Sequence, residues 1–154
     1  MAKAKSYRPK GYNTVTAYLI VHDADAALDY YKRAFGAKEL MRMQDKSGVV
    51  HHSEIQVGNS RVGVADEHPK LGALSPKTVG GTPVRLMVYV PNVDATIKRA
   101  VTMGAKLYRK VADQFYGDRN GGIIDPFGHE WFFATHKEDL TDKEMMARAA
   151  KQGK

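Results

Sequence analysis

The chain contains the same segment twice. Residues 21–38 read VHDADAALDYYKRAFGAK, and residues 90–106 repeat this pattern in looser form as VPNVDATIKRAVTMGAK. Asp25 and Asp94 hold the same place in the two copies, 69 residues apart, and both copies end in Gly-Ala-Lys after one deletion in the second. Because similar sequences form similar local structures, the chain is expected to fold as one unit built twice.

Each copy predicts a strand, a helix and further strands. The apolar runs at residues 15–21 and 84–90 are typical of strands, and each is followed by residues that suit a helix N-cap. We expect Asp25 and Asp94 to cap helices that end at the glycine of Gly-Ala-Lys. Short apolar segments separated by turns predict three more strands in each copy. The predicted fold class is therefore α+β, with two βαβββ repeats.

Composition divides the chain into five segments. The first residues are polar, and a stretch rich in Pro, Gly, Lys and Ser separates the two copies. Near the end, Thr141 and Glu144 form a capping box before a short helix, which we expect to dock through Met145 and Met146. The expected segments are an arm (1–13), a first module (14–66), a linker (67–82), a second module (83–136) and a helical tail (137–154).

Charge and composition exclude several classes of protein. The net charge of the 154 residues is +7, but much of the excess lies near the two ends, and no basic stripe carries interleaved aromatic residues, so nucleic acid is not an expected partner. The chain has no cysteine, which removes disulfides and thiolate chemistry. It has no apolar run of ~18 residues and no secretory signal pattern. We expect a cytoplasmic protein that is not inserted in a membrane.

Two motifs connect the duplicated pattern to a known family. The sequence DPFGHEW at residues 125–131 closes the second copy, and QFYGDR at residues 114–119 precedes it. With two βαβββ copies, these motifs resemble the vicinal oxygen chelate superfamily, which groups glyoxalase I, bleomycin-resistance proteins and extradiol dioxygenases. The resemblance covers about residues 14–136. It implies half-barrel modules around a cleft, closed within one chain or exchanged in a homodimer.

The resemblance also implies where a metal would bind. Enzymes of that superfamily hold a divalent cation on four side chains, usually His and Glu, where it acts as a Lewis acid on substrate oxygens. The corresponding positions are Thr16, Glu54, Arg85 and Phe132, so one carboxylate remains of four. We therefore expect no cofactor, with Arg85 replacing the cation and pairing with Glu54. The alternative is a divalent metal on His52 and Glu54, although His-x-Glu on a strand also forms a simple hydrogen-bonded pair.

Aromatic residues predict the character of the cleft. Tyr18 and Met87 alternate with apolar neighbours, which places them on the cleft face of their strands. Phe115, Tyr116 and Arg119 suit a lip over a pocket, or a hairpin whose turn is fixed by charge while the aromatics join the core.

The expected function is the binding of a small molecule, aromatic or carbonyl-bearing, which the protein sequesters or senses. The alternative is a metal-dependent lyase, isomerase or dioxygenase of the same superfamily. The sequence assigns no catalytic residue, because it has neither a phosphate-binding loop nor a nucleophile elbow. The candidate ligand-binding residues are Thr16, Tyr18, His52, Glu54, Arg85, Met87, Phe115, Tyr116, Arg119 and Phe132.

Overall fold

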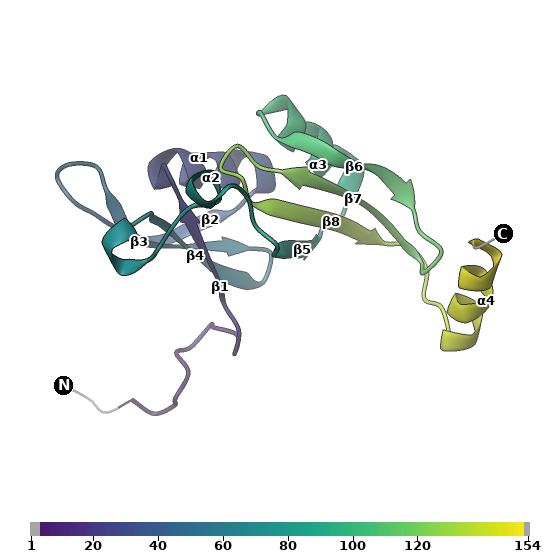
Figure 1. Ribbon diagram of the computed structural model, residues 1–154. Helices are drawn as coiled ribbons and strands as arrows, with labels where there is room; N and C mark the ends of the chain where they lie inside the picture. The colour runs from purple at the N-terminus through teal and green to yellow at the C-terminus, as the bar shows by residue number, and fades with distance from the viewer. Residues whose placement is uncertain (1–3, 153–154) are drawn as a thin grey trace. The chain divides into compact units, whose positions relative to one another are not determined.

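The computed structural model describes residues 4–152, so the predicted arm and tail are seen from Ala4 and as far as Gln152 (Figure 1). The chain divides between Gly81 and Thr82 into two compact units, called unit 1 and unit 2. Each unit has one four-stranded open sheet and one longer helix against it, which confirms the α+β fold class and the two βαβββ repeats. No helix within residues 4–152 has the length and apolar character needed to cross a membrane.

Unit 1 contains a mixed sheet in the order β1-β4-β3-β2. The edge strand β1 is parallel to β4, and the other pairs are antiparallel. Helix α1 packs on one face of this sheet. Side chains along each strand alternate between the two faces, and the aliphatic ones on the helix face are buried. The elements are β1 (Ala17–Val21), α1 (Ala24–Phe35), β2 (Lys38–Gln44), β3 (Val50–Val57), β4 (Ser60–Asp66), η1 (Pro69–Leu71) and α2 (Pro76–Val79).

Unit 2 repeats this arrangement with the order β5-β8-β7-β6. Strand β5 is parallel to β8, and α3 packs against β6, β7 and β8 (Figure 1). Its core is built around Trp131 and Phe133, whose stacked rings have centroids 6.2 Å apart. Ile97 of α3 is also buried. The elements are β5 (Arg85–Tyr89), α3 (Val93–Thr102), β6 (Lys106–Asp113), β7 (Asp118–Ile124), β8 (Glu130–His136) and α4 (Asp142–Gln152).

The helix caps lie two residues before the predicted ones. Asp23 caps α1 by accepting from the Ala26 N–H at 3.0 Å, and Asn92 caps α3 in the same way. The predicted caps, Asp25 and Asp94, are wrong because a cap has an extended backbone and reaches the N–H three residues later. Both residues lie instead in the first helical turn, where a carboxylate is favourable because of the helix dipole.

Two strand boundaries also differ from the prediction. The apolar run at residues 15–21 predicted the first strand, but β1 begins at Ala17, where pairing with β4 starts. Strand β7 extends well beyond its short apolar segment at residues 123–124, which is all that the sequence indicates, because it pairs on both sides with β6 and β8. Gly121 and Gly122 interrupt the apolar pattern, so the sequence does not indicate a strand of this length. Packing requires a glycine at position 121, because a Cβ there would lie 2.7 Å from the Ile97 side chain.

The same aspartate turn is built once in each unit. In unit 2, the Asp125 carboxylate accepts from the N–H groups of Phe127 and His129 at 2.9 and 3.0 Å and from the Trp131 indole at 2.8 Å. In unit 1, Asp45 binds the residues two, four and six positions later in the same way. Asp125 is buried and Asp45 is exposed, so one motif occurs in two environments.

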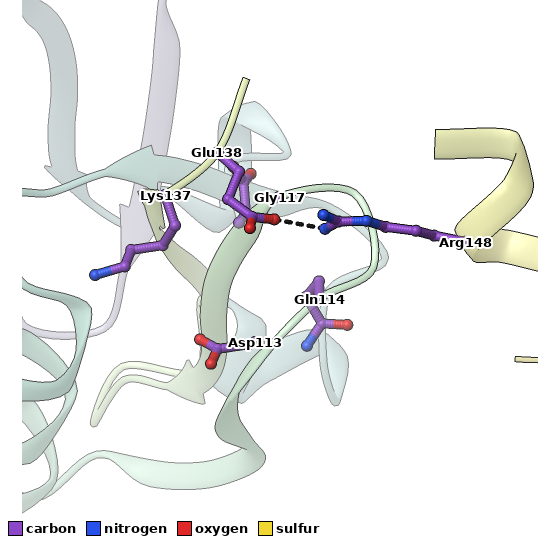
Figure 2. A pocket seen from close by; sticks show the side chains of 7 residues that line it. Asp113, Gln114, Gly117, Lys137, Glu138 and Arg148 are labelled. Atoms are coloured by element: carbon purple, nitrogen blue, oxygen red, sulfur yellow. Dashed lines mark hydrogen bonds and ion pairs between the residues drawn. The ribbon is translucent and has the colours of Figure 1, made fainter. Parts of the chain in front are cut away.

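The capping box of the terminal helix is present, but its predicted docking is not. The Thr141 hydroxyl accepts from the Glu144 N–H at 3.3 Å, and the Glu144 carboxylate accepts from the Thr141 N–H at 2.9 Å. Met146 is 73% exposed, and none of the α4 side chains that the structure describes is buried. Helix α4 is instead attached by an ion pair between Arg148 and Glu138 (Figure 2).

Candidate ligand-binding site

The face of the unit 1 sheet opposite α1 carries a cavity of about 360 Å³. Residues on β1 and β3 alternate between the two faces, so Leu19 and Ile55 are buried under α1 while their neighbours point the other way. Four of the candidate residues come together here, and strand β4 and the arm complete the lining. The lining residues are Pro9, Tyr12, Thr16, Tyr18, His52, Glu54, Arg61, Val62 and Gly63.

Tyr18 and His52 form an aromatic wall of this cavity. Their rings stack with centroids 5.5 Å apart, and the Tyr18 hydroxyl lies 2.6 Å from Nδ1 of His52. Gly63, the cross-strand partner of Tyr18, makes this arrangement possible, because a Cβ there would lie 2.6 Å from the Tyr18 ring. Burial, followed by the negative charge of Glu54, raises the pKa of Tyr18, so its hydroxyl stays protonated at neutral pH.

Glu54 is the polar centre of the cavity. Its side chain is only 12% exposed, and Oε2 accepts from Nη1 of Arg61 at 2.8 Å. Oε1 accepts from the Tyr12 hydroxyl and lies 3.4 Å from Nε2 of His52. The hydrogen bond from Tyr12 is the main cause that lowers the pKa of Glu54, and Arg61 and His52 lower it further, so the group is a carboxylate.

Sequence reasoning missed Arg61 and Tyr12, the two residues that donate hydrogen bonds to Glu54 in this cavity. Arg61 lies on the same face of β4 as Gly63, two residues away, and this alternation could have placed it beside Glu54. Tyr12 gave no such signal, because it belongs to the arm, outside any segment with strand or helix periodicity.

Three candidate residues of unit 2, Arg85, Met87 and Phe132, lie on the open face of its own sheet. Met87 and Phe132 are cross-strand partners on the face opposite α3, as the alternation predicted. Arg85 donates to Oε2 of its own cross-strand partner, Glu130, at 2.6 Å. Arg85 and Glu54 thus each have a partner of opposite charge in their own unit, and the predicted pairing between them stays a prediction.

Phe115 and Tyr116 lie in the hairpin turn between β6 and β7, and Arg119 is the second residue of β7. Phe115 and Tyr116 contact each other edge to face, with centroids 5.1 Å apart. The Arg119 guanidinium donates twice to Asp94 at 2.7 and 2.8 Å and once to Asp113 at 3.1 Å. These bonds, chiefly those to Asp94, raise the pKa of Arg119 and attach the start of β7 to α3. Charge thus fixes the hairpin, as in one of the two interpretations of the sequence, but Phe115 and Tyr116 are only half-buried and do not join the core.

A second cavity of about 400 Å³ lies beside this turn, and its lining includes none of the candidate residues. Figure 2 shows the Glu138 and Arg148 side chains reaching toward each other at this site. The lining has no aromatic side chain and is mostly charged or polar, so it offers little surface for an apolar ligand. It consists of Asp113, Gln114, Gly117, Asp118, Lys137, Glu138 and Arg148.

Comparison with known proteins decides the family. A family model described as the glyoxalase/bleomycin resistance protein/dioxygenase superfamily matches residues 11–133. The chain belongs to this superfamily. An uncharacterized protein of Mycobacterium tuberculosis is 34% identical over 142 residues, which cover 90% of this chain and 84% of that protein.

Two solved structures have the same fold as this member of the superfamily. TioX from Micromonospora sp. ML1 is 26% identical with a TM-score of 0.63, over 84% of this chain and 100% of TioX. A gene product of Arabidopsis thaliana is 28% identical with a TM-score of 0.63, over 80% of this chain and 98% of that one. The match therefore covers nearly the whole length of both solved structures.

At the positions that the resemblance implies for metal ligands, the side chains of this chain are poor ligands for a divalent cation. Within residues 4–152, no three His, Asp or Glu side chains are grouped so that they could hold a metal ion. At the four positions that the resemblance implies, Arg85 carries a permanent positive charge and Phe132 has no donor atom. Both oxygens of Glu54 already accept hydrogen bonds from side chains of the protein.

Proposed function

We propose that this superfamily member binds a small aromatic or carbonyl-bearing molecule in the cavity of unit 1, without a metal ion. The observation that carries the proposal is the meeting of Thr16, Tyr18, His52 and Glu54 around one cavity. Ligand sites typically combine apolar or aromatic walls with a few convergent polar groups. The stacked Tyr18 and His52 rings supply the wall, and Glu54 with Arg61 supplies the polar groups.

The chemistry of the cavity favours binding over catalysis. A flat ligand gains stacking energy on the Tyr18 ring, typically about 0.5–1.5 kcal/mol beyond the burial of its surface. Glu54 is ionised and held by donors, so it can orient a ligand but is poorly suited to abstracting a proton. We therefore propose a role in sequestering or sensing the molecule, as a homodimer, which the resemblance implies, in the cytoplasm, which the composition favours.

A melting-temperature screen tests this proposal. The purified protein is heated with aromatic antibiotics and with small oxo-acids, and a ligand of the folded state raises the melting temperature by an amount that grows with the logarithm of its concentration divided by its Kd. Tyr18→Ala is expected to remove the shift given by any hit. Tyr7→Ala, at a tyrosine that is 91% exposed, is the matched control and should keep it. If no compound raises the melting temperature, or if Tyr18→Ala keeps the shift, the proposed site is wrong.

A second candidate function is a metal-dependent lyase, isomerase or dioxygenase of the same superfamily. It is favoured by one observation: His52 and Glu54, two potential ligands, lie 3.4 Å apart in the cavity. Elemental analysis of freshly purified protein separates the two candidates, because one equivalent of Mn, Fe, Ni or Zn per chain would establish the metal-dependent alternative.

A further inference from the structure

The arm places one of its own side chains in the unit 1 cavity. The Tyr12 hydroxyl donates to Oε1 of Glu54, and the Arg61 guanidinium carbon lies 4.6 Å from the centroid of the Tyr12 ring. The carbonyl of Tyr12 accepts from the Arg8 side chain, and its N–H donates to the carbonyl of Pro9 at 3.3 Å. Tyr12 therefore contacts both members of the Glu54–Arg61 ion pair.

Tyr12 is held in the way a bound molecule would be held. Residues 4–16 form no strand or helix, so no sheet ladder fixes the backbone on either side of it. Its side chain makes one hydrogen bond to a carboxylate and one cation–π contact, which are interactions that a free phenol can also make. The open part of the cavity then lies against Tyr12 as well as against the Tyr18–His52 wall.

The charges around Tyr12 define what could take its place. Glu54 and Arg61 together are neutral, and each is already paired with the other at 2.8 Å. A ligand in the place of Tyr12 would contact both charges. A cationic ligand there would therefore be repelled by Arg61, and an anionic ligand would be repelled by Glu54. Oε1 of Glu54 is an acceptor in a largely buried position, so the favoured ligand is a neutral molecule that donates a hydrogen bond.

We propose that Tyr12 is a built-in occupant of the Glu54–Arg61 site, and that the ligand is a neutral aromatic molecule whose phenolic hydroxyl displaces it. This inference rests on the proposed function and narrows it to one class of ligand. The incoming phenol donates to Glu54 and places its ring against Arg61, while the rest of the molecule lies along Tyr18 and His52. Binding is then a competition between a free phenol and the arm.

The test uses the full chain and two fluorescent probes that differ by one methyl group, 2-naphthol and 2-methoxynaphthalene. Affinities are measured at neutral pH by fluorescence titration. If Tyr12 fills the site in about nine of ten molecules, Tyr12→Ala tightens 2-naphthol binding about tenfold. Tyr12→Phe keeps the ring without the donor and should give a smaller gain. Tyr7→Ala, in the same arm, is the control and should match the unchanged protein.

The ether probe tests the class of ligand. It cannot donate to Glu54, so we expect it to bind about tenfold more weakly than 2-naphthol. Glu54→Gln removes the negative charge of the acceptor and should reduce this preference. Circular dichroism of each variant identifies any that fails to fold, and Tyr12→Phe then serves in place of Tyr12→Ala.

The outcomes separate this inference from the proposed function. Equal affinities for Tyr12→Ala, Tyr12→Phe and the unchanged chain would overturn the built-in occupant, and equal binding of the two probes would overturn the phenolic ligand. If Tyr18→Ala still loses 2-naphthol binding in that case, the cavity remains the binding site and only the inference fails. If none of the variants binds either probe and the screen gives no hit, both fail.

Discussion

The buried carboxylate of Asp125 gives a prediction whose size follows from the structure. It accepts three hydrogen bonds, from the N–H groups of Phe127 and His129 and from the indole of Trp131. Asp125 is 4% exposed and Trp131 is 1% exposed, so water has little access to the donors. Asp125→Ala removes the acceptor of all three bonds at once.

The expected loss of stability is large. A buried donor left without an acceptor costs about 1–3 kcal/mol. The Trp131 indole and the Phe127 N–H are both buried, whereas the partly exposed His129 can bind water. Two orphaned donors give about 2–6 kcal/mol, and we expect about 4 kcal/mol. This is a large share of the roughly 5–15 kcal/mol that stabilises a typical domain.

Urea denaturation measures this loss directly. Trp131 is the single tryptophan of the chain, so its fluorescence reports on unit 2. With a urea slope of about 2 kcal/mol/M, Asp125→Ala should lower the midpoint by about 2 M. Asp45→Ala is the matched control, because Asp45 forms the same turn in an exposed position where its donors can bind water. Its midpoint, followed by circular dichroism, should change much less.

A loss below about 1 kcal/mol for Asp125→Ala would refute the reasoning. A double-mutant cycle with Trp131→Phe locates the effect, because phenylalanine has no N–H to leave unpaired. We expect Trp131→Phe to cost less in the Asp125→Ala background than in the unchanged chain, with both followed by circular dichroism. Additive losses would mean that the hydrogen bond between Asp125 and Trp131 contributes nothing.

Three further predictions concern unit 2 and the metal. Gly117→Ala should destabilise by about 2 kcal/mol or more in a thermal melt, because φ is +95° and a Cβ would collide with the carbonyl of Glu138. The Asp118 carboxylate, followed by Asp139, raises the pKa of His136, so an NMR titration should give a value above 6.5. Protonated His136 therefore contributes to the free energy of unfolding. This contribution is complete below the pKa of His136 in the unfolded chain and is lost as pH rises through its pKa in the folded protein. His136→Gln should remove this pH dependence of stability. Added Mn, Ni, Zn or Fe should leave the melting temperature within about 1 °C, and a large stabilisation would contradict the metal-free proposal.

The repeat and the alternation of faces predicted much of the fold. Two copies of one pattern gave two sheets with the same strand order. The period of two residues along a strand placed Thr16 and Tyr18 on one face, and His52 and Glu54 on another strand of the same face. These are local properties of single strands, so the sequence contains them.

The contacts between segments could not be predicted in the same way. The ion pair between Arg85 and Glu130 follows from the register of β5 on β8, and the sequence analysis did not predict it. Register depends on strand pairing, which periodicity does not specify. Tyr12 reaches the cavity from an irregular arm, whose path depends on tertiary contacts rather than on any repeating pattern.

The duplicated halves differ at one cross-strand pair, and this difference bears on stoichiometry. Tyr18 faces Gly63 in unit 1, and the residues 69 positions later, Met87 and Phe132, face each other in unit 2. Phe132 of unit 2 thus holds the position that Gly63 holds in unit 1. Because Gly63 has no side chain, the Tyr18 ring can lie directly against it, and unit 2 has no such space. Despite the internal symmetry, calorimetric titration should reach saturation at one equivalent of ligand per chain rather than two.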